Sequence, residues 1–334
     1  MLTQNKNDRS NSRLNTPGNR TWMRSNPFRD LLLLAIRPQL VPEESPTVTW
    51  IRKHPIPAVV GLAYGLTWLG LVPLLRDSSL ASRANNLSHA GDPAVLLYAF
   101  LGVLGCLWAA LIVAGAVGGS AGRYALLRGY LKWRAGLQWY LAALFGPVLV
   151  FAVAVGLYNL WTGHMPVLPA FNVLSASLVS AYVFFLNRFL FGNFEEICWR
   201  GSVLPRLQAT NNALAASLII GVIQGMWHLP YLFVLGHYVQ RIGLLAIVIQ
   251  SMAMGIAATW LYNNTRGSLL LVALFHASYD ALSQFQGFDA SLFYVLIAVW
   301  CAAAGILVIL FGARHLSHKP DSELAYVIIP SQEK

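Results

Sequence analysis

Six long stretches of this 334-residue chain contain no Lys, Arg, Asp or Glu, and they limit its fold more than any other feature. They cover residues 54–75, 93–122, 135–187, 207–240, 242–265 and 290–313. About 20 apolar residues cross the hydrocarbon core of a bilayer as a helix, so 135–187 is long enough for two spans. Because backbone groups in lipid must be hydrogen-bonded within the segment, these runs must be helices. The sequence therefore predicts an all-α, polytopic membrane bundle.

The segment 267–286 contains one charged residue, Asp280, and is also expected to span the membrane. We therefore expect about eight spans, centred near 57–75, 94–117, 137–160, 170–191, 211–235, 242–262, 267–286 and 291–312. This divides the chain into a polar, basic and disordered tail (1–54), a membrane domain (55–313) and a C-terminal tail (314–334).

Composition excludes the main alternatives. The chain is 57% hydrophobic and 11% charged, whereas soluble domains average about 25% charged residues. So many apolar residues also exclude a disordered chain. The three Cys are far apart in sequence and fall in or beside the expected spans, so they are interpreted as small packing residues.

The net charge is +10. The basic residues are distributed as in a membrane protein and not as in a nucleic-acid-binding surface, so no nucleic-acid partner is expected. With eight spans, basic residues gather on the side of the N-terminus, which predicts that both termini are cytoplasmic. Besides the N-terminal tail, these residues are Arg123, Arg128, Lys132, Arg134, Arg188, Arg200, Arg206, Arg314 and Lys319.

Three acidic residues lie between Asp92 and Asp289, namely Glu195, Glu196 and Asp280. A carboxylate at membrane depth costs free energy and usually marks function or a required ion pair. On a helix Glu196 and Arg200 share a face as i and i+4, whereas Glu195 is turned about 100° away. The pair predicts that Glu196 is neutralised and that Glu195 is left available. The alternative is a topology anchor at a helix end.

Two histidines fall inside expected spans. His276 and Asp280 are again i and i+4, which fits either a structural hydrogen-bonded couple or an oriented acid, base or ligand. His228 taken alone is more typical of a packing residue. An antiparallel hairpin around Asn211 and Asn212, with 194–208 as a continuous helix, would bring Glu195 and His228 to nearly the same depth.

The three segments together resemble the CAAX protease and bacteriocin-processing (CPBP, or Abi) family of membrane proteins. EEICWRGSVLPRL is similar to the family's first motif, MWHLP to its second and SLLLVALFHASYDAL to its third. The resemblance covers roughly residues 170–290. It implies an eight-span intramembrane endopeptidase that acts on membrane-associated or lipidated peptides from the cytoplasmic side.

The resemblance also implies roles for individual residues. Glu195 would activate water with the help of His228, and His276 with the residue at 280 would stabilise the oxyanion. Glu196 and Arg200 would complete the first motif structurally. Two positions depart from the pattern: Gln224 stands where the family usually has Phe, and Asp280 where it more often has Asn. An anionic Asp280 cannot donate to an oxyanion.

Mechanism and function leave alternatives. Glu195, His228 and His276 are residue types that bind Zn²⁺, but the HExxH pattern of soluble zinc proteases is absent, so a mechanism without a cofactor is preferred. The two departures also fit a non-catalytic member of the fold that acts in bacteriocin self-immunity or as a scaffold. A proton-relay transporter is a third hypothesis. The sequence leaves the oligomeric state open.

Overall fold

The computed structural model describes residues 45–80, 91–166, 182–183, 185–283, 289–320 and 324. Within these ranges the regular structure is helical and contains no strand, which confirms the all-α prediction. Six helices are long and apolar enough to cross a membrane, two of them continued by 3-10 turns. They are α3 (Pro55–Arg76), α6 (Gly105–Leu127, continued to Leu131), α7 (Leu137–Thr162), α10 (Ala213–Trp227, continued to Phe233), α12 (Leu244–Asn264) and α14 (Ala290–Phe311). The chain is a multi-pass membrane protein.

The helices match most of the expected spans. The predictions near 57–75, 137–160, 211–235, 242–262 and 291–312 each coincide with a long helix. The expected span at 267–286 corresponds to the shorter α13 (Leu269–Ser283), and most of the one at 170–191 lies outside the described residues. The remaining short helices are α5 (Pro93–Leu97), α9 (Leu204–Gln208) and α11 (Tyr238–Ile242).

The prediction of one continuous span near 94–117 is wrong. Helix α5 continues as a π-helical turn to Val103. The helix is then interrupted at Leu104, whose backbone is not helical, before α6 begins. The break coincides with a close approach to α3: a Cβ on Gly70 would lie 2.0 Å from the Gly102 nitrogen. Hydropathy does not detect such a break, because the residues on both sides are apolar.

The ends of the membrane domain are also more ordered than predicted. Pro46–Lys53, assigned to the N-terminal tail, forms helix α2, and Arg52 Nε donates to the Ala116 carbonyl oxygen at 2.7 Å. Residues 1–44 lie outside the described ranges. At the other end Leu316 is fully buried, and its carbonyl oxygen accepts from Asn264 Nδ2. Hydrogen bonds to α6 and α12 therefore hold residues that were assigned to the N-terminal and C-terminal tails.

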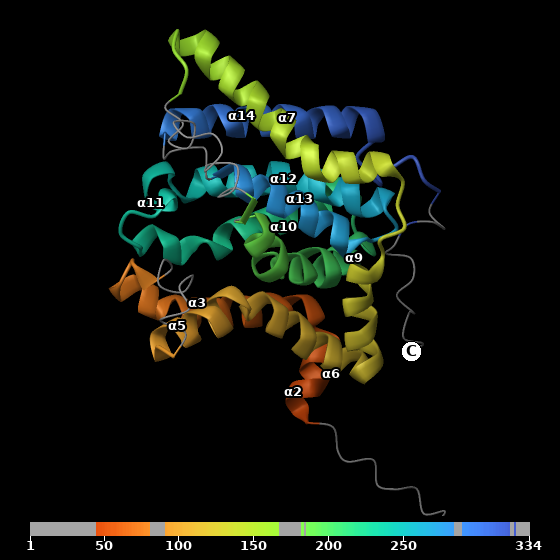
Figure 1. The fold of residues 1–334 in the computed structure, drawn as a ribbon. Helices are drawn as coiled ribbons and strands as arrows, with labels where there is room; N and C mark the ends of the chain where they lie inside the picture. Colours follow the sequence, from red (N-terminus) through yellow and green to blue (C-terminus); the bar gives the residue numbers. More distant parts are fainter. Residues whose placement is uncertain are drawn as a thin grey trace, which may run out of the picture. The chain divides into compact units, whose positions relative to one another are not determined.

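The site-bearing helices lie in the middle of the bundle (Figure 1). Helix α10 packs on α12, and α12 packs on both α13 and α14. Helices α3 and α6 lie on one side of this group, whereas α7 and α14 lie on the other. The central helices are therefore shielded on two sides by apolar helices.

Two glycines bring α10 and α12 into direct backbone contact. A Cβ added to Gly221 would lie 2.4 Å from Met252 Cα, and one added to Gly225 would lie 2.6 Å from Val248 Cα. Small residues four apart allow this approach in membrane helix pairs. The contact fixes the part of α10 that carries Gln224 and His228.

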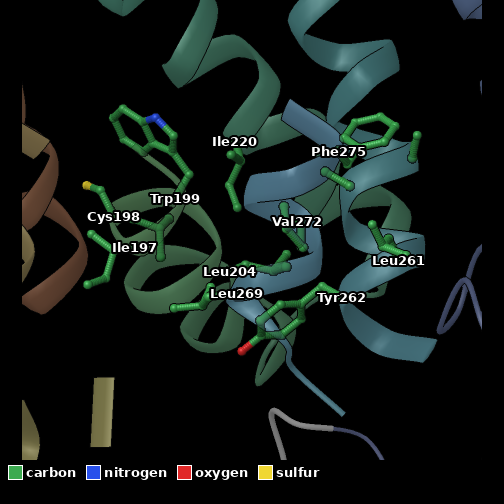
Figure 2. Packing of buried hydrophobic residues seen from close by; sticks show 14 of the residues in the cluster. Ile197, Cys198, Trp199, Leu204, Ile220, Leu261, Tyr262, Leu269, Val272 and Phe275 are labelled. Atoms are coloured by element: carbon green, nitrogen blue, oxygen red, sulfur yellow. The ribbon is translucent and has the colours of Figure 1, made fainter. Parts of the chain in front are cut away.

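A buried apolar cluster holds the segment after Glu196 against α10, α12 and α13. Figure 2 shows Ile197, Cys198, Trp199 and Leu204 beside side chains from these three helices, and Trp199 is fully buried. The other labelled members are Ile220 from α10, Leu261 and Tyr262 from α12, and Leu269, Val272 and Phe275 from α13. This packing anchors the acidic segment on one side.

Candidate active site

A polar cavity lies among the central helices, and every candidate residue of the sequence analysis lines it. Its volume is about 90 Å³, whereas a single water needs about 10–15 Å³ measured in the same way. The cavity therefore has room for several waters or for a peptide group. The lining residues that the sequence singled out are Glu195, Glu196, Arg200, Gln224, His228, His276 and Asp280.

Local chain geometry brings the acidic pair to the cavity. The chain turns at Asn193, whose side chain donates to the Ala273 carbonyl oxygen and whose own carbonyl oxygen accepts from Tyr130. The following Ile197–Val203 is a π-helical segment, so the continuous α-helix assumed for the hairpin is wrong in this part. Such segments are frequent at functional sites. Glu195 and Glu196, just before it, are 7% and 2% exposed.

Glu196 is the centre of a charged cluster. Its Oε1 accepts from Arg200 NH1 at 3.0 Å and from His276 Nδ1 at 2.8 Å. The predicted pair with Arg200 is thus confirmed, and the bond to His276 is an addition that the sequence did not indicate. Arg200 is 2% exposed, so this ion pair is buried inside the bundle, which disfavours the alternative of a topology anchor at a helix end.

Glu195 faces the same cavity with a different partner. Its Oε2 accepts from Gln224 Nε2 at 3.4 Å, while Gln224 Oε1 accepts from Arg200 NH1 at 2.8 Å. The two neighbouring carboxylates therefore have different surroundings: Glu196 contacts a guanidinium and an imidazole, and Glu195 contacts a neutral amide. The structure supports the prediction that Glu196, rather than Glu195, is neutralised.

The tautomer of His228 follows from its acceptor. His228 Nδ1 lies 2.9 Å from the Gln224 carbonyl oxygen, and a carbonyl oxygen only accepts. Nδ1 therefore carries the hydrogen, and Nε2 presents a lone pair. His228 and Glu195 both line the cavity, as the hairpin argument expected. A neutral imidazole with this tautomer is suited to accept a hydrogen bond from water.

Asp280 has a partner that sequence reasoning missed. Its Oδ2 accepts from Arg188 Nε at 2.7 Å, whereas its Oδ1 is 3.8 Å from His276 Nε2. Arg188 had been assigned to the cytoplasmic charge pattern because it follows the charge-free run 135–187, but it lines the cavity. The sequence contains one signal for this pair: an acidic residue inside one apolar span and an arginine at the end of another.

Further uncharged residues of α12 and α13 complete the wall. Gln250 and Ser251 line the cavity from α12 and Tyr279 from α13, and Gln250 is hydrogen-bonded to Tyr279. Neither charge nor motif distinguishes these residues in the sequence.

Among the described residues no group of three or more His, Cys, Asp or Glu side chains is arranged to hold a metal ion. Nδ1 of His276 and Nδ1 of His228 both face protein acceptors, an arrangement that metal-binding histidines share. The mechanism without a metal therefore stays a prediction.

Fold and cavity define a multi-pass helical membrane protein with carboxylates, imidazoles and guanidinium groups gathered around a cavity that has room for several waters. The sequence model of the family described as Rce1-like, type II CAAX prenyl endopeptidase, matches residues 177–282. A curated relative, CAAX prenyl protease 2 of Methanococcus maripaludis, is 32% identical over 93 residues. That match covers 26% of this chain and 34% of the relative's length. Both comparisons confirm the resemblance to the CPBP family, and the family-model match contains every residue that lines the cavity.

Proposed function

We propose that the protein is an intramembrane endopeptidase that hydrolyses a peptide bond in membrane-associated or lipidated peptides. The observation that carries the proposal is the cavity, in which Glu195 and His228 face a space large enough for water. The matched family and the relative's name, CAAX prenyl protease 2, support a lipidated peptide as the substrate class.

Glu195 is assigned as the general base. Glu196 is bound by Arg200 and His276, so Glu195 is the carboxylate of the pair that remains able to take a proton from water. His228 Nε2 accepts a second hydrogen bond and orients the same water. General-base catalysis of this kind contributes about 10²–10⁴-fold to a rate.

His276 is assigned to the oxyanion. With Nδ1 bound to Glu196, its Nε2 is turned toward the Asp280 side of the cavity. A protonated Nε2 donates to the negative oxygen that forms on the scissile carbonyl, and preset donors of this kind supply a large part of catalysis. Asp280 accepts from Arg188, so we assign it to holding that guanidinium at the cavity rather than to donation.

The proposed orientation places both termini in the cytoplasm, because basic residues gather on that side. Arg188 and Arg200 line the cavity and are not loop residues, so the orientation is inferred from the other basic residues. Cysteines introduced at Ser10 and Ala325 should be protected from an impermeant reagent applied to intact cells. Labelling of either position from outside would contradict the orientation.

The function is tested by cleavage of a lipidated peptide in detergent with Glu195→Gln. We expect cleavage to fall by at least about 10²–10⁴-fold, with the melting temperature close to that of the wild type. His228→Ala and His276→Ala should lose activity similarly, with little added loss in combination because the groups act as a unit. Full cleavage by folded Glu195→Gln would overturn the assignment. A wild-type protein that cleaves no membrane-anchored peptide would favour the scaffold or immunity alternative.

A further inference from the structure

Gln224 occupies the position where the proposed base and its neighbours meet. It lies on α10, is 7% exposed and lines the cavity. The resembling family usually has Phe at this position, and a phenyl ring would make none of the hydrogen bonds described here. The amide therefore has to be explained from this chain's own contacts.

The direction of the Gln224 amide is determined by its surroundings. Arg200 has only N–H donors, so the Gln224 atom 2.8 Å from its NH1 must be the carbonyl oxygen. The amino group, Nε2, is then directed at Glu195 Oε2, at 3.4 Å. Because Arg200 is itself bound to Glu196, a flipped amide would place N–H groups against a guanidinium.

The same residue also orients His228. The Gln224 backbone carbonyl oxygen accepts from His228 Nδ1 at 2.9 Å. Gln224 thus contacts both groups that are proposed to bind the water. Its side chain contacts Glu195, and its backbone contacts His228. The close contact of Gly225 with Val248 holds this turn against α12.

We propose that Gln224 is a positioning residue that orients the Glu195 carboxylate and couples it to the Glu196–Arg200–His276 cluster. The catalytic part of this inference rests on the proposed function, but the coupling itself does not. The amide donates to Glu195 without placing a charge next to the base, and its oxygen occupies a donor of Arg200 that would otherwise compete for Glu195.

A hydrogen bond to a carboxylate oxygen changes the stretching frequency of the carboxylate, so loss of the Gln224 donor should shift the infrared band of Glu195. The other charged or titratable groups that line this cavity are Arg188, Glu196, Arg200, His228, His276 and Asp280, with the phenols of Tyr238 and Tyr279. A neutral substitution of Gln224 leaves all of them in place and adds no charge, so a shift of the Glu195 band reports on the amide.

The experiment compares Gln224→Met and Gln224→Phe with the wild type. Infrared spectroscopy follows the Glu195 carboxylate band, identified as the band lost in Glu195→Gln. We expect this band to shift in both variants, because each removes the amide that donates to Glu195. In cleavage of a lipidated peptide, kcat should fall about tenfold to a hundredfold, with KM little changed.

Gln208→Met is the matched control. Gln208 is also buried, and both ends of its amide bond Asn263 outside the cavity, so its loss should lower the melting temperature and leave the Glu195 band unchanged. If Gln224→Met does not fold, Gln224→Phe places at this position the residue that is usual in the resembling family. An unchanged Glu195 band in the folded variant overturns the proposal. A shifted band in a protein that cleaves nothing supports the coupling and contradicts the proposed function.

Discussion

Two buried polar clusters hold the interior of this bundle together, and they differ in charge. The cavity cluster consists of Glu195, Glu196, Arg200, Gln224 and His276, and all five residues line the cavity. The amide cluster consists of Gln208, Asn263, Asn264 and Ser317, and none of its residues lines that cavity. Both clusters are buried and hydrogen-bonded, so burial alone does not distinguish a site from a structural contact.

The hydrogen bonds of the amide cluster explain its residues by a structural role alone. Asn263 Nδ2 donates to Gln208 Oε1 at 2.8 Å and to the His315 carbonyl oxygen at 2.7 Å. Asn264 Nδ2 binds the Leu316 carbonyl oxygen in the same way, at 2.9 Å. These neutral bonds attach the segment after α14 to the end of α12. The cavity cluster instead buries charged residues among apolar helices, which is costly and therefore favours a chemical role.

The largest effect is expected from Glu196→Gln. The substitution removes the only negative charge hydrogen-bonded to Arg200 among the described residues, and loss of one partner of a buried pair costs about 3–5 kcal/mol. We therefore expect a markedly lower melting temperature in detergent, unlike Glu195→Gln. This difference would show that the two carboxylates have separate roles.

A second variant sharpens this test. Glu196→Gln combined with Arg200→Met removes both charges of the Glu196–Arg200 pair, so part of the stability should return even though two polar groups are lost. Glu196→Gln with a wild-type melting curve would show that charge pairing does not hold the cavity cluster.

The next effect concerns Arg188 and Asp280, at 2.7 Å. Arg188→Met should lower kcat about tenfold to a hundredfold, because the charge of Asp280 then lacks the guanidinium that binds it at the cavity. In an Asp280→Asn background the same substitution should cost less. A double-mutant cycle on kcat measures this coupling. If Arg188 bound substrate instead, KM would rise and Asp280→Asn would not restore activity.

Much of the fold was predictable because lipid leaves few alternatives to long apolar helices. The break at Leu104 was not, since it depends on the approach of α3 to Gly102. Helix α2 and the packed segment around Leu316 also escaped prediction, because they are held by hydrogen bonds to or from residues distant in sequence.

The site was predictable where residues share one helix and less so across helices. The Glu196–Arg200 pair follows from a spacing of four, and the structure confirms it. The bonds from His276 to Glu196 and from Arg188 to Asp280 join residues 80 and 92 positions apart, and no periodicity indicates them. Gln224 was singled out as a departure from a motif, whereas its two amide contacts required the packing of α10 against the acidic segment.

The smallest effect is expected from Asn263→Ala in the amide cluster. The change leaves Gln208 and the His315 carbonyl oxygen without their partner, which typically costs about 1–2 kcal/mol for neutral groups. We expect a lower melting temperature with kcat and KM unchanged at a temperature where the variant is folded. Asn263→Asp should not restore the loss, because a carboxylate cannot donate to the carbonyl oxygen. A changed pH profile of cleavage in Asn263→Ala would contradict the separation, since it would mean that the amide cluster communicates with Glu195.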